Sequence, residues 1–177
     1  MSATMDAIDA PLDAAELATR WRAMCADPAF EELVGRVELT EWGEITMTQI
    51  GKTHGLVAMR VAKAVEAALG GHVMAAVGIL TSMGIRAPDI ACCSDAWLAA
   101  HPEEMPLSAA PELCIEIASA SNALPRLREK AAAYVRAGAS EAWLVFPDSK
   151  RLEVYGRAGL QAASEFAVEI SPAFAKR

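Results

Sequence analysis

The sequence is poor in several features that would assign it to a specialised class of protein. It has four cysteines and three histidines in 177 residues, with no C-x-x-C pair and no histidine near a cysteine at zinc-binding spacing. This pattern argues against a zinc site and favours buried thiols that behave as small apolar side chains. Charged or polar residues interrupt the longest apolar stretch, which excludes a membrane span there. These residues are Arg60, Lys63, Glu66 and His72.

Positive charge is also scarce, because 16 Lys and Arg residues face 23 Asp and Glu residues and leave a net charge of −7. An acidic protein repels a phosphate backbone at long range, which disfavours strong non-specific nucleic-acid binding but allows a local basic face. The N-terminal stretch lacks a basic segment followed by an apolar one, as a secretion signal would have. We therefore expect a cytoplasmic protein that makes no contact with membranes.

The length and the balance of residue types suit one globular domain. Hydrophobic residues make up 54% and charged residues 22% of the chain, values close to those of average globular proteins. A chain of 177 residues can bury a core without disulfides or metals as staples. We expect an N-terminal helical extension over 1–28, the main domain over 29–170, and a tail over 171–177.

The spacing of apolar residues predicts a mixture of helices and strands. Helical spacing predicts long helices over 11–26, 51–69 and 123–138, and a short helix over 94–104. Alternation of polar and apolar residues predicts a hairpin over 36–48. Further strands are expected over 72–77, 79–83, 88–94, 113–119, 141–147, 151–156 and 160–166. This order predicts an α/β or α+β fold with a central mixed β-sheet.

Two carboxylates stand out by their context. Asp89 follows Pro88 at the start of a predicted strand, and Glu116 lies inside an apolar one, where an unpaired carboxylate would cost several kcal/mol. If their strands are neighbours, both side chains can converge at one edge of the sheet and hold Mg²⁺ together with water. A structural ion pair of Glu116 with Arg126 or Arg128 is the alternative.

The helix after Glu116 offers cations that its own strand lacks, since the residue two positions on is alanine. Lys130 and Tyr134 are four residues apart and therefore share a helix face. A lysine stem on that face can present its amine toward Glu116. Considered without these neighbours, Lys130 would be expected to be exposed to solvent. Arg126 and Arg128 belong to the same basic group, which is where a phosphate backbone would lie.

Three segments occur in the order typical of a known enzyme family. "PD" at 88–89, "EIAS" at 116–119 and "REKAAAYVRAGASEAWLV" at 128–145 resemble the Uma-type restriction endonucleases, a branch of the PD-(D/E)XK nuclease superfamily. "VELTEWGEITMT" and "GKTHGLVAMRVAKAV" resemble the Glu-bearing hairpin and histidine-led helix of that family. The resemblance covers roughly residues 30 to 160 and implies a restriction-endonuclease-like mixed sheet flanked by helices.

The resemblance also implies roles for individual residues. Asp89 and Glu116 would bind Mg²⁺, with Mn²⁺ as an alternative, and Lys130 would be the catalytic lysine, moved from strand to helix. Glu38 would be a helper acid in catalysis. The segment "SASN" at 119–122 departs from the family, which usually has a Ser-Pro-Ser-Thr-like turn there. Residues expected to line the site are His54, Arg126, Arg128 and Tyr134.

The function expected from these residues is a Mg²⁺-dependent endonuclease that hydrolyses DNA phosphodiester bonds by metal-assisted attack of water. A non-catalytic, nuclease-like binding or assembly module is the alternative, favoured by the acidic charge, and a small-molecule phosphoesterase is a third. We also expect a homodimer, because enzymes that cut both strands often pair two sites by two-fold symmetry. Strands near Trp143 and Tyr155 are the expected dimer contact.

Overall fold

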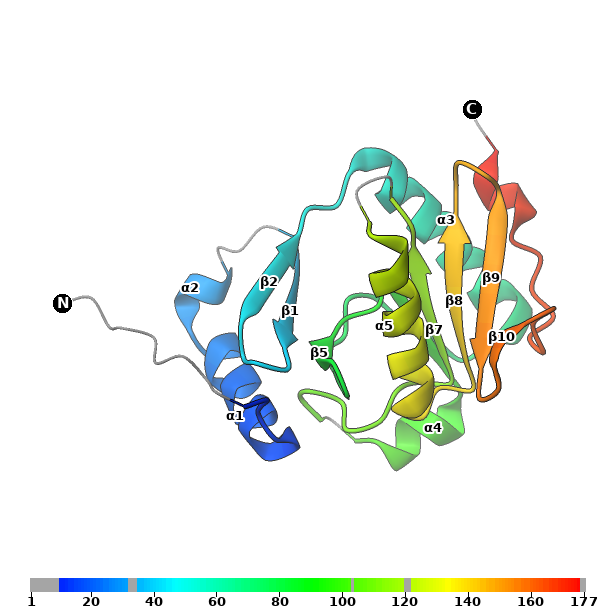
Figure 1. Cartoon of the computed structure of the whole chain (residues 1–177). Helices are drawn as coiled ribbons and strands as arrows, with labels where there is room; N and C mark the ends of the chain where they lie inside the picture. The colour runs from blue at the N-terminus through cyan, green and yellow to red at the C-terminus, as the bar shows by residue number, and fades with distance from the viewer. Residues whose placement is uncertain (1–9, 32–34, 103, 120–121, 176–177) are drawn as a thin grey trace.

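Two β-sheets and the helices packed on them make up a computed structural model that describes residues 10–31, 35–102, 104–119 and 122–175 (Figure 1). The helices are α1 (Ala14–Cys25), α2 (Pro28–Glu31), α3 (Lys52–Leu69), α4 (Asp95–Ala100), α5 (Leu124–Arg136) and the 3₁₀ helix η1 (Ser171–Phe174). The strands are β1 (Arg36–Thr40), β2 (Ile45–Thr48), β3 (His72–Met74), β4 (Ile79–Thr81), β5 (Gly84–Arg86), β6 (Ile90–Cys93), β7 (Leu113–Ile117), β8 (Glu141–Phe146), β9 (Arg151–Gly156) and β10 (Gly159–Gln161).

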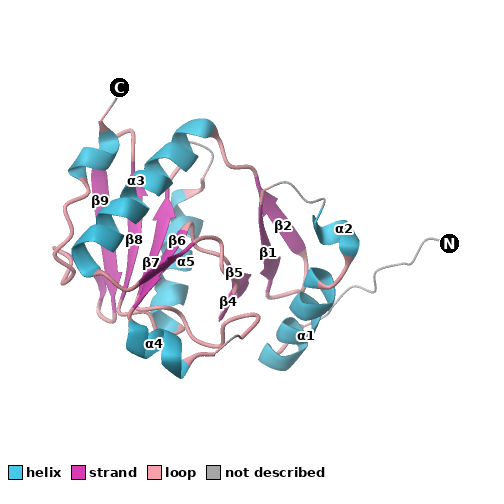
Figure 2. Cartoon of the chain, turned by 180° about the vertical axis from the view of Figure 1, so that it is seen from behind, coloured by secondary structure: helices cyan, strands magenta, loops and turns pink. Residues whose placement is uncertain are grey.

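The larger sheet has the strand order β10-β9-β8-β7-β6-β3 and lies between two helices (Figure 2). Only β7 and β8 run parallel, and α5 makes the crossover between them. One face packs against α3 through Ile115, Ile117 and Trp143, whereas the other packs against α5 through Cys114 and Leu144. Because both faces of β7 are covered, all five of its positions are buried, which explains its nearly continuous apolar sequence.

The smaller sheet has the order β2-β1-β5-β4 and packs against α1. Leu17 and Trp21 from α1 meet Leu39 and Ile85 from the sheet in a separate apolar cluster. Side chains of a strand alternate between its two faces, so Arg36, Glu38 and Thr40 point away from this cluster. That alternation turns the polar face of β1 toward the larger sheet and fixes where polar groups of the two sheets meet.

The structure confirms the α/β fold class with helices flanking a mixed sheet, but it also corrects the expected strands. We expected one central sheet and did not predict β5, because Gly84 at the start of its segment resembled a turn. Gly84 has φ of +96°, and a Cβ there would collide with the backbone of Leu39 and Thr40 in β1. The glycine therefore marks close approach of two strands. Strand β3 is shorter than the expected segment 72–77, and β10 overlaps only the start of the expected segment 160–166.

The ends of the described chain pack onto the rest of the molecule. Helix α1 lies on β4 and β5, and Ala173 of η1 is buried in the core cluster beside α3. The domain limits at 28/29 and 170/171 remain predictions, and residues 1–9 and 176–177 lie outside the described part. Within the described ranges, none of the helices has the length and apolar character needed to span a membrane.

The dimer contact expected from the strands near Trp143 and Tyr155 stays a prediction, but these two side chains are themselves buried. The Trp143 side chain is 0% exposed, and its indole N–H donates to Glu141 within the same chain. Tyr155 is 9% exposed and donates to Glu153. Both side chains are therefore core residues of a single chain, as the apolar pattern on both sides of Trp143 also indicates, and a contact between subunits would have to use other residues.

Candidate functional site

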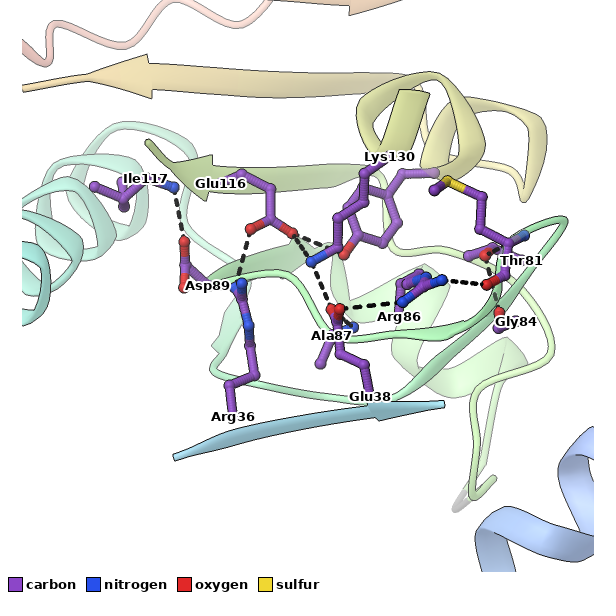
Figure 3. A network of polar contacts seen from close by, with 12 residues as sticks. Arg36, Glu38, Thr81, Gly84, Arg86, Ala87, Asp89, Glu116, Ile117 and Lys130 are labelled. Atoms are coloured by element: carbon purple, nitrogen blue, oxygen red, sulfur yellow. Dashed lines mark hydrogen bonds and ion pairs between the residues drawn. The ribbon is translucent and has the colours of Figure 1, made fainter. Parts of the chain in front are cut away.

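The four residues expected to take part in catalysis meet between the two sheets (Figure 3). The Lys130 Nζ lies 2.8 Å from Glu116 Oε1 and 2.5 Å from Glu38 Oε1. The Asp89 and Glu116 carboxylates share one cation, Arg36, whose Nη1 is 2.6 Å from Asp89 Oδ1 and 2.9 Å from Glu116 Oε2. None of these side chains is more than 10% exposed. The structure thus brings Asp89, Glu116, Lys130 and Glu38 to one place.

Strand geometry places Asp89 beside Glu116. The pairing of β6 with β7 ends at Ile90 and Ile115. The next N–H of β7 on the β6 side is that of Ile117, which therefore needs another acceptor. Asp89 Oδ2 accepts this N–H at 2.7 Å. The carboxylate is thereby fixed at the end of the ladder, with its second oxygen turned toward Arg36.

Helix α5 supplies Lys130 and Tyr134 from its buried face. Both side chains belong to the stripe that packs on the larger sheet, as their spacing of four residues predicts. The Tyr134 hydroxyl donates to Glu116 Oε1 at 2.9 Å. Burial raises the pKa of Tyr134 well above its usual value, and the neighbouring Glu116 charge raises it further. Tyr134 therefore stays a neutral donor that helps to orient Glu116.

Arg36 is the principal member of the cluster that sequence reasoning missed. A signal was present, because Arg36 precedes Glu38 by two positions and so shares its face of β1. The side chain is only 8% exposed. Burial by itself would lower the Arg36 pKa, but Glu116, Asp89 and Glu38 raise it overall. Arg36 therefore remains a cation in the buried cluster.

Glu38 is a buried network residue and not the exposed hairpin residue that its position alone suggests. Its Oε1 accepts the Ala87 N–H at 2.8 Å in addition to the Lys130 ion pair, and its Oε2 faces Arg86. Burial acts to raise the Glu38 pKa, but the charges of Lys130 and Arg36 outweigh it and lower the pKa below the usual value. Glu38 is thus a carboxylate at neutral pH.

His54 reaches the cluster from the first turn of α3. Its Nε2 lies 2.9 Å from Asp89 Oδ1, the oxygen that also faces Arg36. Burial acts to raise the Asp89 pKa, but the His54 hydrogen bond, the Arg36 charge and the Ile117 N–H together lower it. The expectation that His54 lines the site agrees with this geometry.

Arg126 and Arg128 of α5 have different positions relative to the cluster. Arg126 is exposed and lines a pocket of about 260 Å³ that also contains Glu38 and Lys130. Arg128 does not line the site, because its guanidinium makes two hydrogen bonds to Glu153 on β9 at 2.8 and 3.0 Å. The alternative in which Arg126 or Arg128 pairs with Glu116 is therefore wrong.

The lowered carboxyl pKa values predict a specific pH dependence of stability. A carboxyl whose pKa is lower in the folded state stabilises the fold above its unfolded pKa of about 4, and this contribution disappears as the pH falls through the folded pKa. We expect the free energy of unfolding of Glu38→Gln to fall less steeply below about pH 4 than that of the wild type. Urea unfolding at a series of pH values measures this, and parallel curves would contradict the prediction.

The donor set can be tested for its fit to a divalent metal ion. No group of three or more His, Cys, Asp or Glu side chains in the described ranges is arranged as a metal site. However, Asp89 Oδ1 and Glu116 Oε2 converge on a single atom, Arg36 Nη1, which acts as a stand-in cation. Carboxylate oxygens and water are the ligands that Mg²⁺ prefers. The two carboxylates therefore fit such an ion, provided that the Arg36 guanidinium moves away from them.

Comparison with known proteins identifies the fold and the family of the chain. The fold is similar to that of a putative nuclease belonging to DUF820 from Anabaena variabilis ATCC 29413, with a TM-score of 0.64 and 16% sequence identity over 82% of this chain and 94% of the other. A comparison with curated proteins finds no match. The model of the Uma2 family, described as "Putative restriction endonuclease", matches residues 27–174. Because this match covers most of the sequence, the chain belongs to the Uma2 family.

Proposed function

We propose that the protein is a divalent-metal-dependent endonuclease that hydrolyses phosphodiester bonds of DNA. The observation that carries this proposal is the convergence of Asp89 and Glu116 on one cation position, with the Lys130 ammonium 2.8 Å from Glu116. Membership of the Uma2 family supports it. In this proposal Asp89 and Glu116 hold Mg²⁺ or Mn²⁺, which supplies an activated water and positive charge for the phosphate.

The remaining side chains would orient the reacting groups. The Lys130 ammonium is a point charge that can stabilise the phosphate oxygen on which negative charge builds up. Glu38 holds Lys130 from the opposite side and Tyr134 holds Glu116, so the two groups keep their relative positions before substrate arrives. His54 fixes the Asp89 carboxylate in the same way. Because these side chains are already held in place, less free energy is needed to position them during the reaction.

Basic and polar groups around the openings of the cluster suit a phosphate backbone. One pocket of about 400 Å³ lies where Arg36, Lys52, His54 and Asn122 meet. Arg126 lines the second opening, beside Lys130. The net charge of −7 predicts that these local cations, not the protein as a whole, would attract DNA. Two copies would present two such sites to the two strands, and light scattering can test for this homodimer.

Cleavage of plasmid DNA tests the proposal directly. We expect the wild type to cut with Mg²⁺ or Mn²⁺ and not with EDTA, and Asp89→Asn to lower the rate by about 100-fold or more, since a ligand charge is lost. Asp95→Asn is the control, because Asp95 is on the surface and pairs with His72. Metal-dependent cleavage that is equal in wild type and Asp89→Asn would refute the assignment of the site.

A non-catalytic binding or assembly module is the second candidate, and one observation favours it. Arg36 and Lys130 already neutralise Asp89 and Glu116, so the cluster is satisfied as an ion-pair network that joins the two sheets. Calorimetric titration with Mg²⁺ and Mn²⁺ separates the two candidates. Heat of binding that is absent in Asp89→Asn supports the nuclease, whereas no binding at millimolar metal supports the module.

A further inference from the structure

Arg36 stands at the point where a metal ion held by Asp89 and Glu116 would have to lie. Its Nη1 contacts Asp89 Oδ1 and Glu116 Oε2 at 2.6 and 2.9 Å, and these are the two oxygens that face each other across the site. The other oxygens are engaged, since Asp89 Oδ2 accepts the Ile117 N–H and Glu116 Oε1 accepts from Tyr134. A divalent cation therefore competes with Arg36 for the same pair of oxygens.

One donor of the Arg36 guanidinium has no partner in the described part of the chain. Arg36 Nε is buried and has no hydrogen-bond partner among the described residues, while Nη1 makes both ion pairs. A buried donor without a partner destabilises the arrangement that contains it. The resting position of Arg36 is thus less well satisfied than that of Lys130, whose ammonium contacts two carboxylates in the same cluster.

Space for a second position of the guanidinium exists on several sides. Arg36 lines the pocket beside Lys52 and His54, the pocket beside Arg126 and Lys130, and an apolar groove of about 440 Å³ between α3 and β3. The side chain can therefore leave the carboxylates by rotating into a pocket, without unfolding β1. Arg36 does not leave the carboxylates by losing its proton, because Glu116, Asp89 and Glu38 raise its pKa against the effect of burial.

We propose that Arg36 is a positioning residue that holds Asp89 and Glu116 together in the metal-free protein and must swing away for the metal to bind. This inference rests on the proposed function, because it concerns the entry of the metal. A divalent cation and a guanidinium at the same two oxygens would repel each other, so each excludes the other. Arg36 thereby keeps two buried carboxylates paired before metal arrives and sets the metal concentration at which the site loads.

Calorimetric titration of Mn²⁺ into variants tests the exchange. If the Arg36-free state makes up about 1–10% of the population, Arg36→Met should bind Mn²⁺ about 10- to 100-fold more tightly than wild type. The matched control is Arg86→Met, which removes a second buried arginine, 3.4 Å from Glu38 and not in contact with Asp89. Its Mn²⁺ affinity should stay within about threefold of wild type, because only long-range charge changes.

The outcomes separate this inference from the proposed function. In one outcome, wild type and Arg36→Met bind Mn²⁺ with equal affinity, and both lose this binding when Asp89→Asn is added. This outcome overturns the role of Arg36 but supports the metal site. An equal gain in Arg36→Met and Arg86→Met also overturns it, because general charge would then be the cause. Absence of Mn²⁺ binding in every variant refutes the metal site itself, and the Arg36 inference with it.

A measurement on the wild type covers the case in which Arg36→Met does not fold. In protein labelled with ¹⁵N-arginine, the Nε–H signal of Arg36 is assigned by its loss in Arg36→Lys. Titration with Mg²⁺ should shift this signal in step with binding and leave the signal of Arg86 in place. An Arg36 signal that stays unchanged at saturating Mg²⁺ would show that the guanidinium does not move, which overturns the inference.

Discussion

Replacing Lys130 with methionine is expected to lower the free energy of unfolding by about 3–5 kcal/mol, because it breaks a buried ion-pair network. The Lys130 side chain is 9% exposed, and its ammonium separates Glu38 from Glu116. Methionine keeps the apolar stem but leaves two buried carboxylates with one cation fewer. Glu38 and Glu116 then repel each other, and the Lys130 charge no longer offsets the cost of burying them. Both effects lower the free energy of unfolding.

Urea unfolding at neutral pH measures this loss. The control is Arg128→Met, which removes a cation from the same helix, but one that is 44% exposed and pairs with Glu153 outside the cluster. The effect of Lys130→Met should shrink as the pH falls below about 4, because Glu38, whose pKa is lowered by Lys130, then becomes protonated and no longer needs a cation. A loss no larger than that of Arg128→Met would mean that water or another group already compensates the carboxylates.

The elements of the fold that could be predicted from sequence are those with a long, regular pattern. Helices α1, α3 and α5 follow from apolar periodicity, because one face of each helix packs on a core. The hairpin β1–β2 follows from the alternation of polar and apolar residues, although all four residues of β2 are exposed. Strand β5 has three residues and contains Gly84, so its pairing with β1 leaves no periodic signal. The division into two sheets is likewise a property of pairing between distant segments, which local patterns do not encode.

The same distinction holds for the site. Glu116 could be singled out because a carboxylate is anomalous in a buried strand, and Lys130 because helical spacing directs it toward that strand. Arg36 shares the face of Glu38 on β1, but β1 by itself does not show that this face turns toward the larger sheet. Arg128 was misplaced for the complementary reason, because Glu153 on β9, 25 residues away, captures its guanidinium. Partners distant in sequence decide which charged residues enter the cluster.

Glu116→Gln is expected to reduce metal-dependent DNA cleavage by about 1,000-fold or more, the largest effect that we expect on activity. The change removes one of two ligand charges, and metal assistance contributes several kcal/mol to such reactions, where each 1.4 kcal/mol is about tenfold in rate. Glutamine keeps the shape of the side chain and can still accept from Tyr134 and Lys130 through its carbonyl oxygen. Loss of activity would therefore reflect chemistry at the site more than a missing contact.

Glu141→Gln is the matched control for this experiment, because Glu141 is also 2% exposed and lies on β8, parallel to the strand of Glu116. Its carboxylate accepts from Trp143, Ser164 and the Glu165 N–H, away from Arg36 and Lys130. Both changes place an amide against hydrogen-bond donors, so both should lower stability to a similar degree. Cleavage that falls equally in the two variants would trace the effect to folding, whereas a fall confined to Glu116→Gln assigns the carboxylate to the reaction.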